Sequence, residues 1–187
     1  MKQAIAVAFI SVAAALPATA ADTYTIDKDH TYPSFEFSHM GISIWRGKFT
    51  RTSGKVTLDR AARTGSVQVL VNTQSIEFGH KAMNEFAIAE DWLNTQWHPT
   101  MGFQGTLRFE GDAPAAVDGR LTLLGVSHPL TLRISSFKCI EHPLFKREVC
   151  GADAEGELNR ADYGMKLYSE GDLGKIRLRI QVEALKD

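Results

Sequence analysis

Hydrophobic and polar residues alternate along most of the chain after residue 22. The clearest case is near the end, where Ile176, Leu178 and Ile180 are separated by Arg177 and Arg179. Strict alternation predicts strands with one dry and one wet face, as in antiparallel sheets. The same period recurs at 34–39, 67–72, 103–109 and 130–134. The pattern therefore predicts an all-β protein.

Turn sequences such as Gly111-Asp112 separate the predicted strands every 8–15 residues or so. About eight strands with one apolar face each either close into a barrel or pair as two sheets. A closed barrel of that size has an interior that is filled by side chains or holds one small ligand. Four glycines fall on the predicted inward faces, where they serve either bends or a ligand: Gly47, Gly105, Gly119 and Gly156.

One segment departs from the period of two. Between His80 and Asn94 the apolar positions Met83, Phe86 and Ala87 come closer to a period of 3.6, and Pro99 ends the segment. We expect one or two short helices between the strands of the otherwise all-β domain.

The first 21 residues have the features of a cleaved signal peptide. Lys2 precedes a short apolar run over residues 4–16, and Ala18-Thr19-Ala20 supplies small residues for cleavage. The run is too short for a membrane span. We therefore expect an exported protein with one domain over residues 22–187.

Only two cysteines, Cys139 and Cys150, occur in the 187 residues. In an oxidising compartment, cysteines eleven positions apart form one disulfide across a hairpin more readily than a metal site. We expect this disulfide and no bound metal.

Composition and motifs give no support to catalysis or to nucleic-acid binding. The formal net charge is −1, which disfavours phosphate-backbone binding. The chain contains no GxSxG, HExxH, GxGxxG or GxxxxGK motif. We predict a protein that is not an enzyme, with no catalytic residues and no cofactor.

Several short motifs, in order, resemble the YceI-like family of bacterial periplasmic proteins. They cover essentially the whole chain after the leader: Phe35-x-Phe37-Ser-His39, Gly47-Lys-Phe49, Trp97-His-Pro99, Gly125-Val-Ser-His-Pro129 and Arg160-Ala-Asp162-Tyr-Gly164-Met165. The resemblance implies a periplasmic, lipocalin-like antiparallel β-barrel that holds a polyisoprenoid or a similar long amphiphile, such as the tail of a quinone.

On this reading, large apolar and aromatic side chains line the ligand cavity. The expected lining residues are Phe35, Phe37, His39, Trp45, Phe49, Val69, Val71, Phe86, Trp92, Phe103, Leu123, Ile134, Met165 and Ile180. His39, Arg46 and Lys48 are candidates to contact the ligand head group.

Two other functions stay open. One is a solidly packed protein that docks a membrane redox partner such as a cytochrome, and the other is an enzyme acting on a lipid. Inward-facing aromatics pack as core when no ligand space remains, and the sequence leaves that choice open, together with whether the protein forms a homodimer.

Overall fold

The structure, a computed structural model, describes residues 21–187, so the predicted leader lies outside the described residues except for Ala21. Most of the described chain is strand, and every strand pairing is antiparallel. The strands are β1 (Asp22–Ile26), β2 (Tyr32–His39), β3 (Ser43–Phe49), β4 (Thr52–Asp59), β5 (Thr64–Asn72), β6 (Ile76–Glu77), β7 (Thr100–Glu110), β8 (Ala113–Leu123), β9 (Val126–Glu141), β10 (Glu148–Asn159) and β11 (Lys175–Lys186).

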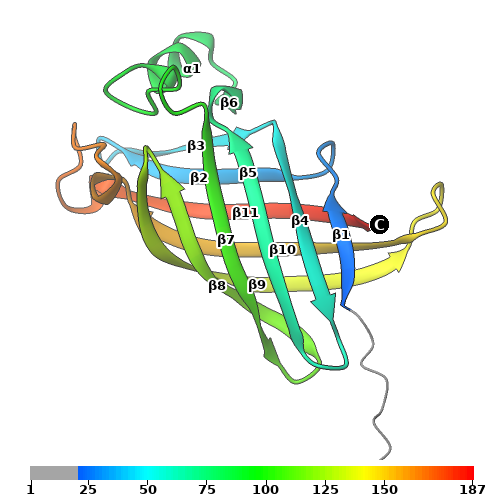
Figure 1. The fold of residues 1–187 in the computed structure, drawn as a ribbon. Helices are drawn as coiled ribbons and strands as arrows, with labels where there is room; N and C mark the ends of the chain where they lie inside the picture. Colours follow the sequence, from blue (N-terminus) through cyan, green and yellow to red (C-terminus); the bar gives the residue numbers. More distant parts are fainter. Residues whose placement is uncertain (1–20) are drawn as a thin grey trace, which may run out of the picture.

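The strands close into a ring. The order runs β1-β4-β5-β7-β8-β9-β10-β11, and β11 pairs again with β1 through Tyr24 opposite Lys186. The architecture is therefore a closed eight-stranded antiparallel barrel and not a pair of packed sheets (Figure 1). This confirms the predicted lipocalin-like barrel of about eight strands.

Three strands of the ring, β1, β4 and β5, bend and continue beyond it as β2, β3 and β6. β2 follows β1 along the same edge of β11, β3 leads into β4, and β5 leads into β6 through the 3-10 helix η1 (Thr73–Ser75). The extensions pair with one another as β2–β3–β6. At the bends, the buried hydroxyls of Thr31 and Thr73 hydrogen-bond to the backbone of Glu183 and His98. These bonds satisfy backbone groups where the ladders change direction.

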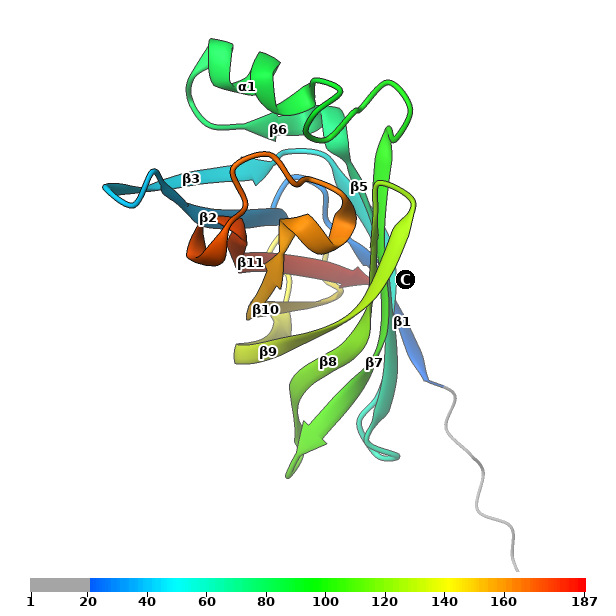
Figure 2. The same cartoon turned by 90° about the vertical axis from the view of Figure 1, so that its left-hand side faces the viewer.

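Two irregular segments lie at one end of the barrel. The helix α1 (Lys81–Ile88) begins at His80, whose ring accepts a hydrogen bond from the Met83 backbone N–H. The 3-10 helices η2 (Arg160–Tyr163) and η3 (Gly171–Gly174) connect β10 to β11. Figure 2 looks into this end, with α1 above the ring and the η2–η3 connection in front of it. The helix predicted within His80–Asn94 is thus present as α1.

The two faces of the barrel wall differ in burial as the alternation predicts. Along β11, Arg177 and Arg179 are exposed, whereas Ile176, Leu178 and Ile180 face inward and are half-buried. The exposed arginines pair with carboxylates of the neighbouring strands. The inward residues stay only half-buried because they face an internal space.

Candidate functional site

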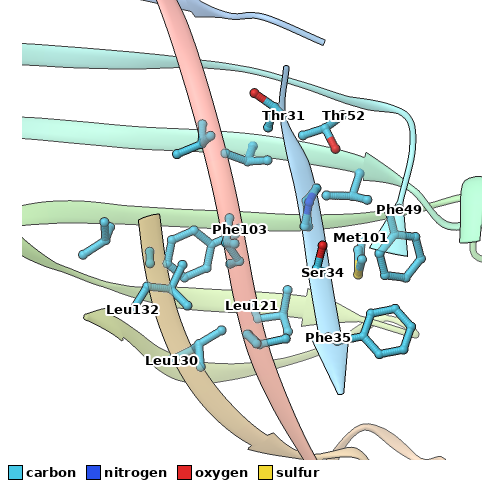
Figure 3. Close-up of a pocket in the computed structure, with 18 of the residues that line it drawn as sticks. Thr31, Ser34, Phe35, Phe49, Thr52, Met101, Phe103, Leu121, Leu130 and Leu132 are labelled. Carbon is cyan, nitrogen blue, oxygen red and sulfur yellow. The ribbon is translucent and has the colours of Figure 1, made fainter. Parts of the chain in front are cut away.

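An apolar cavity of about 280 Å³ occupies the inside of the barrel. Every strand of the ring contributes lining side chains, as do α1 and the segment that follows it. Figure 3 shows part of this lining, in which Phe103, Leu121, Leu130 and Leu132 gather toward one side. The volume lies near the lower limit of ligand-binding pockets, which fits a slender ligand.

The cavity runs along most of the length of the barrel. On β10 its lining extends from Cys150 to Leu158, and on β11 from Ile176 to Ala184. Eight residue steps of a strand span about 26 Å. The cavity is therefore long and narrow, which suits an extended chain better than a compact ring system.

Few polar side chains line this cavity. Thr31 and Ser34 form hydrogen bonds with the backbone, and the Tyr24 hydroxyl donates to the Glu148 carboxylate. Thr52 is 5% exposed, and its hydroxyl has no hydrogen-bond partner within residues 21–187. Among residues 21–187, Arg160 is the one charged residue in the lining, and it is 5% exposed.

Aromatic residues of α1 and of the segment that follows it lie beside Arg160 of η2 at one end of the cavity. The rings of Phe86 and Trp92 lie 5.1 Å apart, and the Arg160 guanidinium carbon lies 4.6 Å from the Trp92 ring centre. All three residues line the cavity. The two segments that cover this end therefore contact each other through Arg160 and Trp92.

A polar cluster lies at the opposite end, where β10 begins. The Glu148 carboxylate accepts hydrogen bonds from the Tyr24 hydroxyl and, at 3.1 Å, from the Arg60 guanidinium. Burial and the bond to Glu148 raise the pKa of Tyr24 to about 12. Burial acts to raise the pKa of Glu148, but the bonds from Tyr24 and Arg60 outweigh it and lower that pKa overall. The charges of Glu148 and Arg60 balance each other, and the Tyr24 hydroxyl has a hydrogen-bond partner. This cluster therefore gives no indication of a ligand site.

Most of the residues predicted to line a ligand cavity do line this one. They are Phe35, Phe37, Phe49, Val69, Val71, Phe86, Trp92, Phe103, Leu123, Ile134, Met165 and Ile180. Whether they contact a ligand stays a prediction.

His39 and Trp45 are exceptions, and the prediction for them is wrong in position. Neither lines the cavity; their rings stack on each other with centres 4.6 Å apart. They share the inward face of β2 and β3 with residues that do line the cavity, such as Phe35 and Phe49. His39 and Trp45 lie nearer the turn between the two strands, outside the lining.

The candidates for the head-group contact are also misplaced. Arg46 lies on the outer face and forms an ion pair with Glu36, and the Lys48 ammonium lies 4.6 Å from the centre of the Tyr32 ring. Neither lines the cavity. Alternation along β3 places both on the outward face, because Gly47 between them faces inward.

Sequence reasoning missed Arg160 and Thr52. Arg160 belongs to the motif that gives the family resemblance, but an arginine in a connection between strands reads as an exposed residue. Thr52 begins β4 and lies on the same face as Val56 and Leu58, so the alternation along this strand is the signal that could have found it.

The inward glycines make room for protein side chains. A Cβ at Gly47 would lie 2.7 Å from the Phe35 ring, and a Cβ at Gly119 would lie 2.7 Å from the Phe103 ring. Gly105 and Gly156 are similarly close to Val117 and Leu132, and none of the four lines the cavity. Their role is to admit neighbouring side chains where the wall is crowded.

The predicted disulfide is present. Cys139 on β9 and Cys150 on β10 face each other in the strand register and are bonded. Glu148 lies close to both sulfurs, but disulfide sulfurs are not thiolates, and the Arg60 guanidinium is 3.0 Å from the Cys139 sulfur. The cluster therefore forms a cross-link and not a metal-binding group in this state.

Within residues 21–187, none of the helices combines the length and the apolar content that crossing a membrane requires.

Known proteins resemble this chain over nearly all of its length. The UPF0312 protein of Pseudomonas aeruginosa (strain LESB58) is 30% identical over 177 residues, which are 90% of this chain and 89% of that protein. The protein YceI of Escherichia coli O17:K52:H18 is 29% identical over 193 residues, covering 99% and 98% of the two chains.

Solved structures share the fold. BcnA of Burkholderia cenocepacia superposes with a TM-score of 0.64 at 17% identity, over 81% of this chain and 95% of its own. A polyisoprenoid binding domain from Saccharophagus degradans gives 0.58 at 16% identity, over 88% and 98%. The family described as the YceI-like domain matches residues 24–184. With that match and the relatives aligned along its length, this chain belongs to the YceI-like family.

Proposed function

We propose that this protein binds and carries a long apolar lipid, of isoprenoid type, inside its barrel. The observation that carries the proposal is the narrow apolar cavity that follows β10 and β11 along the barrel. Burying one CH₂ group contributes about 0.8 kcal/mol. Ten buried carbons would contribute roughly 8 kcal/mol, which is comparable to the 4–15 kcal/mol cost of association, so tight binding favours a longer chain.

The family supports this ligand class. A structural relative with the same fold is described as a polyisoprenoid binding domain. A lipid with a quinone head has the same kind of chain and would be held by the same walls.

We propose a binding role rather than a catalytic one. Among residues 21–187, the lining contains one charged residue and a few hydroxyls, and none of its serine or threonine hydroxyls is hydrogen-bonded to a side chain that could act as a base. The open interior also argues against a solidly packed protein whose only role is to dock a redox partner, because that alternative required a filled barrel.

A periplasmic location is part of the proposal. It rests on the predicted leader over residues 1–21 and on a disulfide of the kind that persists in oxidising compartments. Cell fractionation with N-terminal sequencing tests it: we expect a periplasmic protein that starts near residue 22, and an uncleaved cytoplasmic chain would contradict it.

Native mass spectrometry, followed by extraction into organic solvent, tests the binding role. We expect protein purified from its own host to carry a hydrophobic molecule that extraction removes. The variant Val69→Trp places a large side chain in the cavity, so it should fold but lose most of the bound molecule.

Leu70→Trp is the matched control. Leu70 is the neighbouring residue on β5, is 55% exposed and faces outward, so this variant should retain the ligand. An empty wild-type protein, or equal retention by both variants, would contradict the proposed function.

A further inference from the structure

Arg160 is a buried cation whose partners are backbone carbonyls. Its guanidinium donates hydrogen bonds to the carbonyl oxygens of Met165, at 3.0 Å, and Tyr168. Within residues 21–187 it forms no ion pair, although Glu170 acts on it electrostatically from a distance. Burial lowers the pKa of the guanidinium. An arginine has five N–H donors and stays charged in proteins, so three donors remain free here.

Trp92 adds another unused donor at the same place. Its indole N–H is buried and has no hydrogen-bond partner in the described part of the chain. Because the Arg160 guanidinium carbon is 4.6 Å from the Trp92 ring centre, a single head group can contact both residues. Buried polar groups of native proteins are nearly always hydrogen-bonded, so this donor calls for a partner from outside the described residues, and a ligand oxygen in the cavity can supply it.

We propose that Arg160 and Trp92 form the head-group site of the cavity and select a lipid whose head carries an anionic oxygen, such as a carboxylate or a phosphate. This inference rests on the proposed lipid-binding function and names the class of ligand. It places the head at the end covered by α1 and η2, with the chain extending toward Cys150.

The donor groups of Arg160 and Trp92 explain why the site prefers an anionic head group to a cationic one. The guanidinium and the indole N–H donate and do not accept hydrogen bonds, so the site suits oxygen acceptors and not ammonium groups. A buried charge without an ionic partner is costly, and hydrogen bonds between charged groups are roughly twice as strong as neutral ones. Glu170 opposes an anion, but it lies outside the cavity lining and does not contact the guanidinium.

Ligands that share one chain and differ in the head test the inference. We would use delipidated full-length mature protein and measure binding of geranylgeranoic acid, geranylgeranyl monophosphate, geranylgeraniol and geranylgeranylamine at pH 8. The acid and the phosphate should bind roughly 10- to 100-fold more tightly than the alcohol, as expected for added charge-assisted hydrogen bonds. The amine should bind most weakly.

Three variants assign the preference to the site. Arg160→Met removes the charge, and Trp92→Phe removes the N–H while keeping a ring beside the guanidinium. Both should reduce the ratio of acid to alcohol affinity, the first to near one. Arg46→Met removes an arginine from the outer face and should leave the ratio unchanged.

The outcomes are distinct. A purely structural Arg160 would lose acid and alcohol binding together, with an unchanged ratio, and this would overturn the inference. Equal affinity of wild-type protein for acid and alcohol would overturn it too, while leaving the carrier function intact. Failure of all four ligands to bind would contradict the carrier function itself. If Arg160→Met does not fold, the wild-type ranking and Trp92→Phe decide.

Discussion

At the residue scale, several glycines of the barrel wall leave space that the side chains of neighbouring residues fill. Gly119 on β8 is the most crowded of the four inward-facing glycines, because a Cβ at this position would also lie 2.4 Å from the Gln104 carbonyl oxygen. Gly102 on β7 lies in the same sheet, but its Cβ would meet nothing closer than 3.5 Å. The two positions therefore separate the effect of crowding from the general effect of glycine in a strand.

We expect Gly119→Ala to lower the free energy of unfolding by roughly 1–3 kcal/mol, the usual cost of overpacking. Gly102→Ala should be neutral or stabilising by up to about 1 kcal/mol, since alanine costs less conformational entropy. Urea denaturation followed by tryptophan fluorescence measures both. Equal stabilities of the two variants would show that the wall adjusts to a methyl group at either position.

Tyr24 gives a pH dependence of stability that can also be assigned to one residue. Its pKa is about 12 in the folded protein, raised above the ordinary value of 10.0. Below pH 10 both states hold the proton and the contribution to stability is complete. Between pH 10 and 12 the unfolded chain loses the proton first, so the free energy of unfolding falls by as much as about 1.4 kcal/mol per pH unit.

The measurement compares wild-type protein with Tyr24→Phe at pH 8, 10 and 11. The stability difference between them should be constant up to about pH 10 and then decrease, because phenylalanine has no proton to lose. A difference that stays constant through pH 11 would contradict the assignment to Tyr24.

At the element scale, the alternation of apolar and polar residues located segments of β2, β5, β7, β9 and β11, and a local change of period located α1. The bends could not be predicted in this way. Continuation of β1, β3 and β5 into β2, β4 and β6 depends on pairing between segments that are distant in sequence. His39 and Trp45 have the predicted facing, but they lie near the turn between β2 and β3, outside the cavity lining.

The β9–β10 hairpin carries the disulfide, and its contribution to stability can be measured. It closes a loop of sequence separation 11, for which loop-closure entropy predicts about 3 kcal/mol of stabilisation. Cys139→Ser with Cys150→Ser should therefore lower the free energy of unfolding by about this amount and leave lipid binding largely unchanged. A large loss of binding would instead show that the hairpin shapes the end of the cavity near Cys150.

At the scale of the whole molecule, ligand binding and stability are linked. A ligand that binds only the folded barrel stabilises it by about 2.7 kcal/mol at a free concentration of 100 times its dissociation constant. We expect delipidated protein to unfold at a lower temperature than protein purified with its ligand, and added lipid to restore the difference. Identical melting temperatures, with lipid present in only one sample, would contradict binding inside the barrel.

The apolar character of the candidate site could be predicted from the sequence, but its position in the fold could be predicted only in part. Nine of the twelve predicted residues that line the cavity lie on strands, where facing is a local property of the alternating sequence. The existence of the empty space was not predictable, since it depends on how side chains from all strands fill a closed ring. The contact between Arg160 and Trp92 joins two connections that no local pattern brings together.

Closure of the ring by β1 and β11 has a consequence for how the chain reaches its folded state. The paired residues of these strands lie up to 162 positions apart, and β11 also pairs with β10 and β2. Until β11 docks, three ladders are unfinished and the apolar interior is open to water. Contacts of such long range form slowly, so we expect closure of the ring to be the slow step of folding.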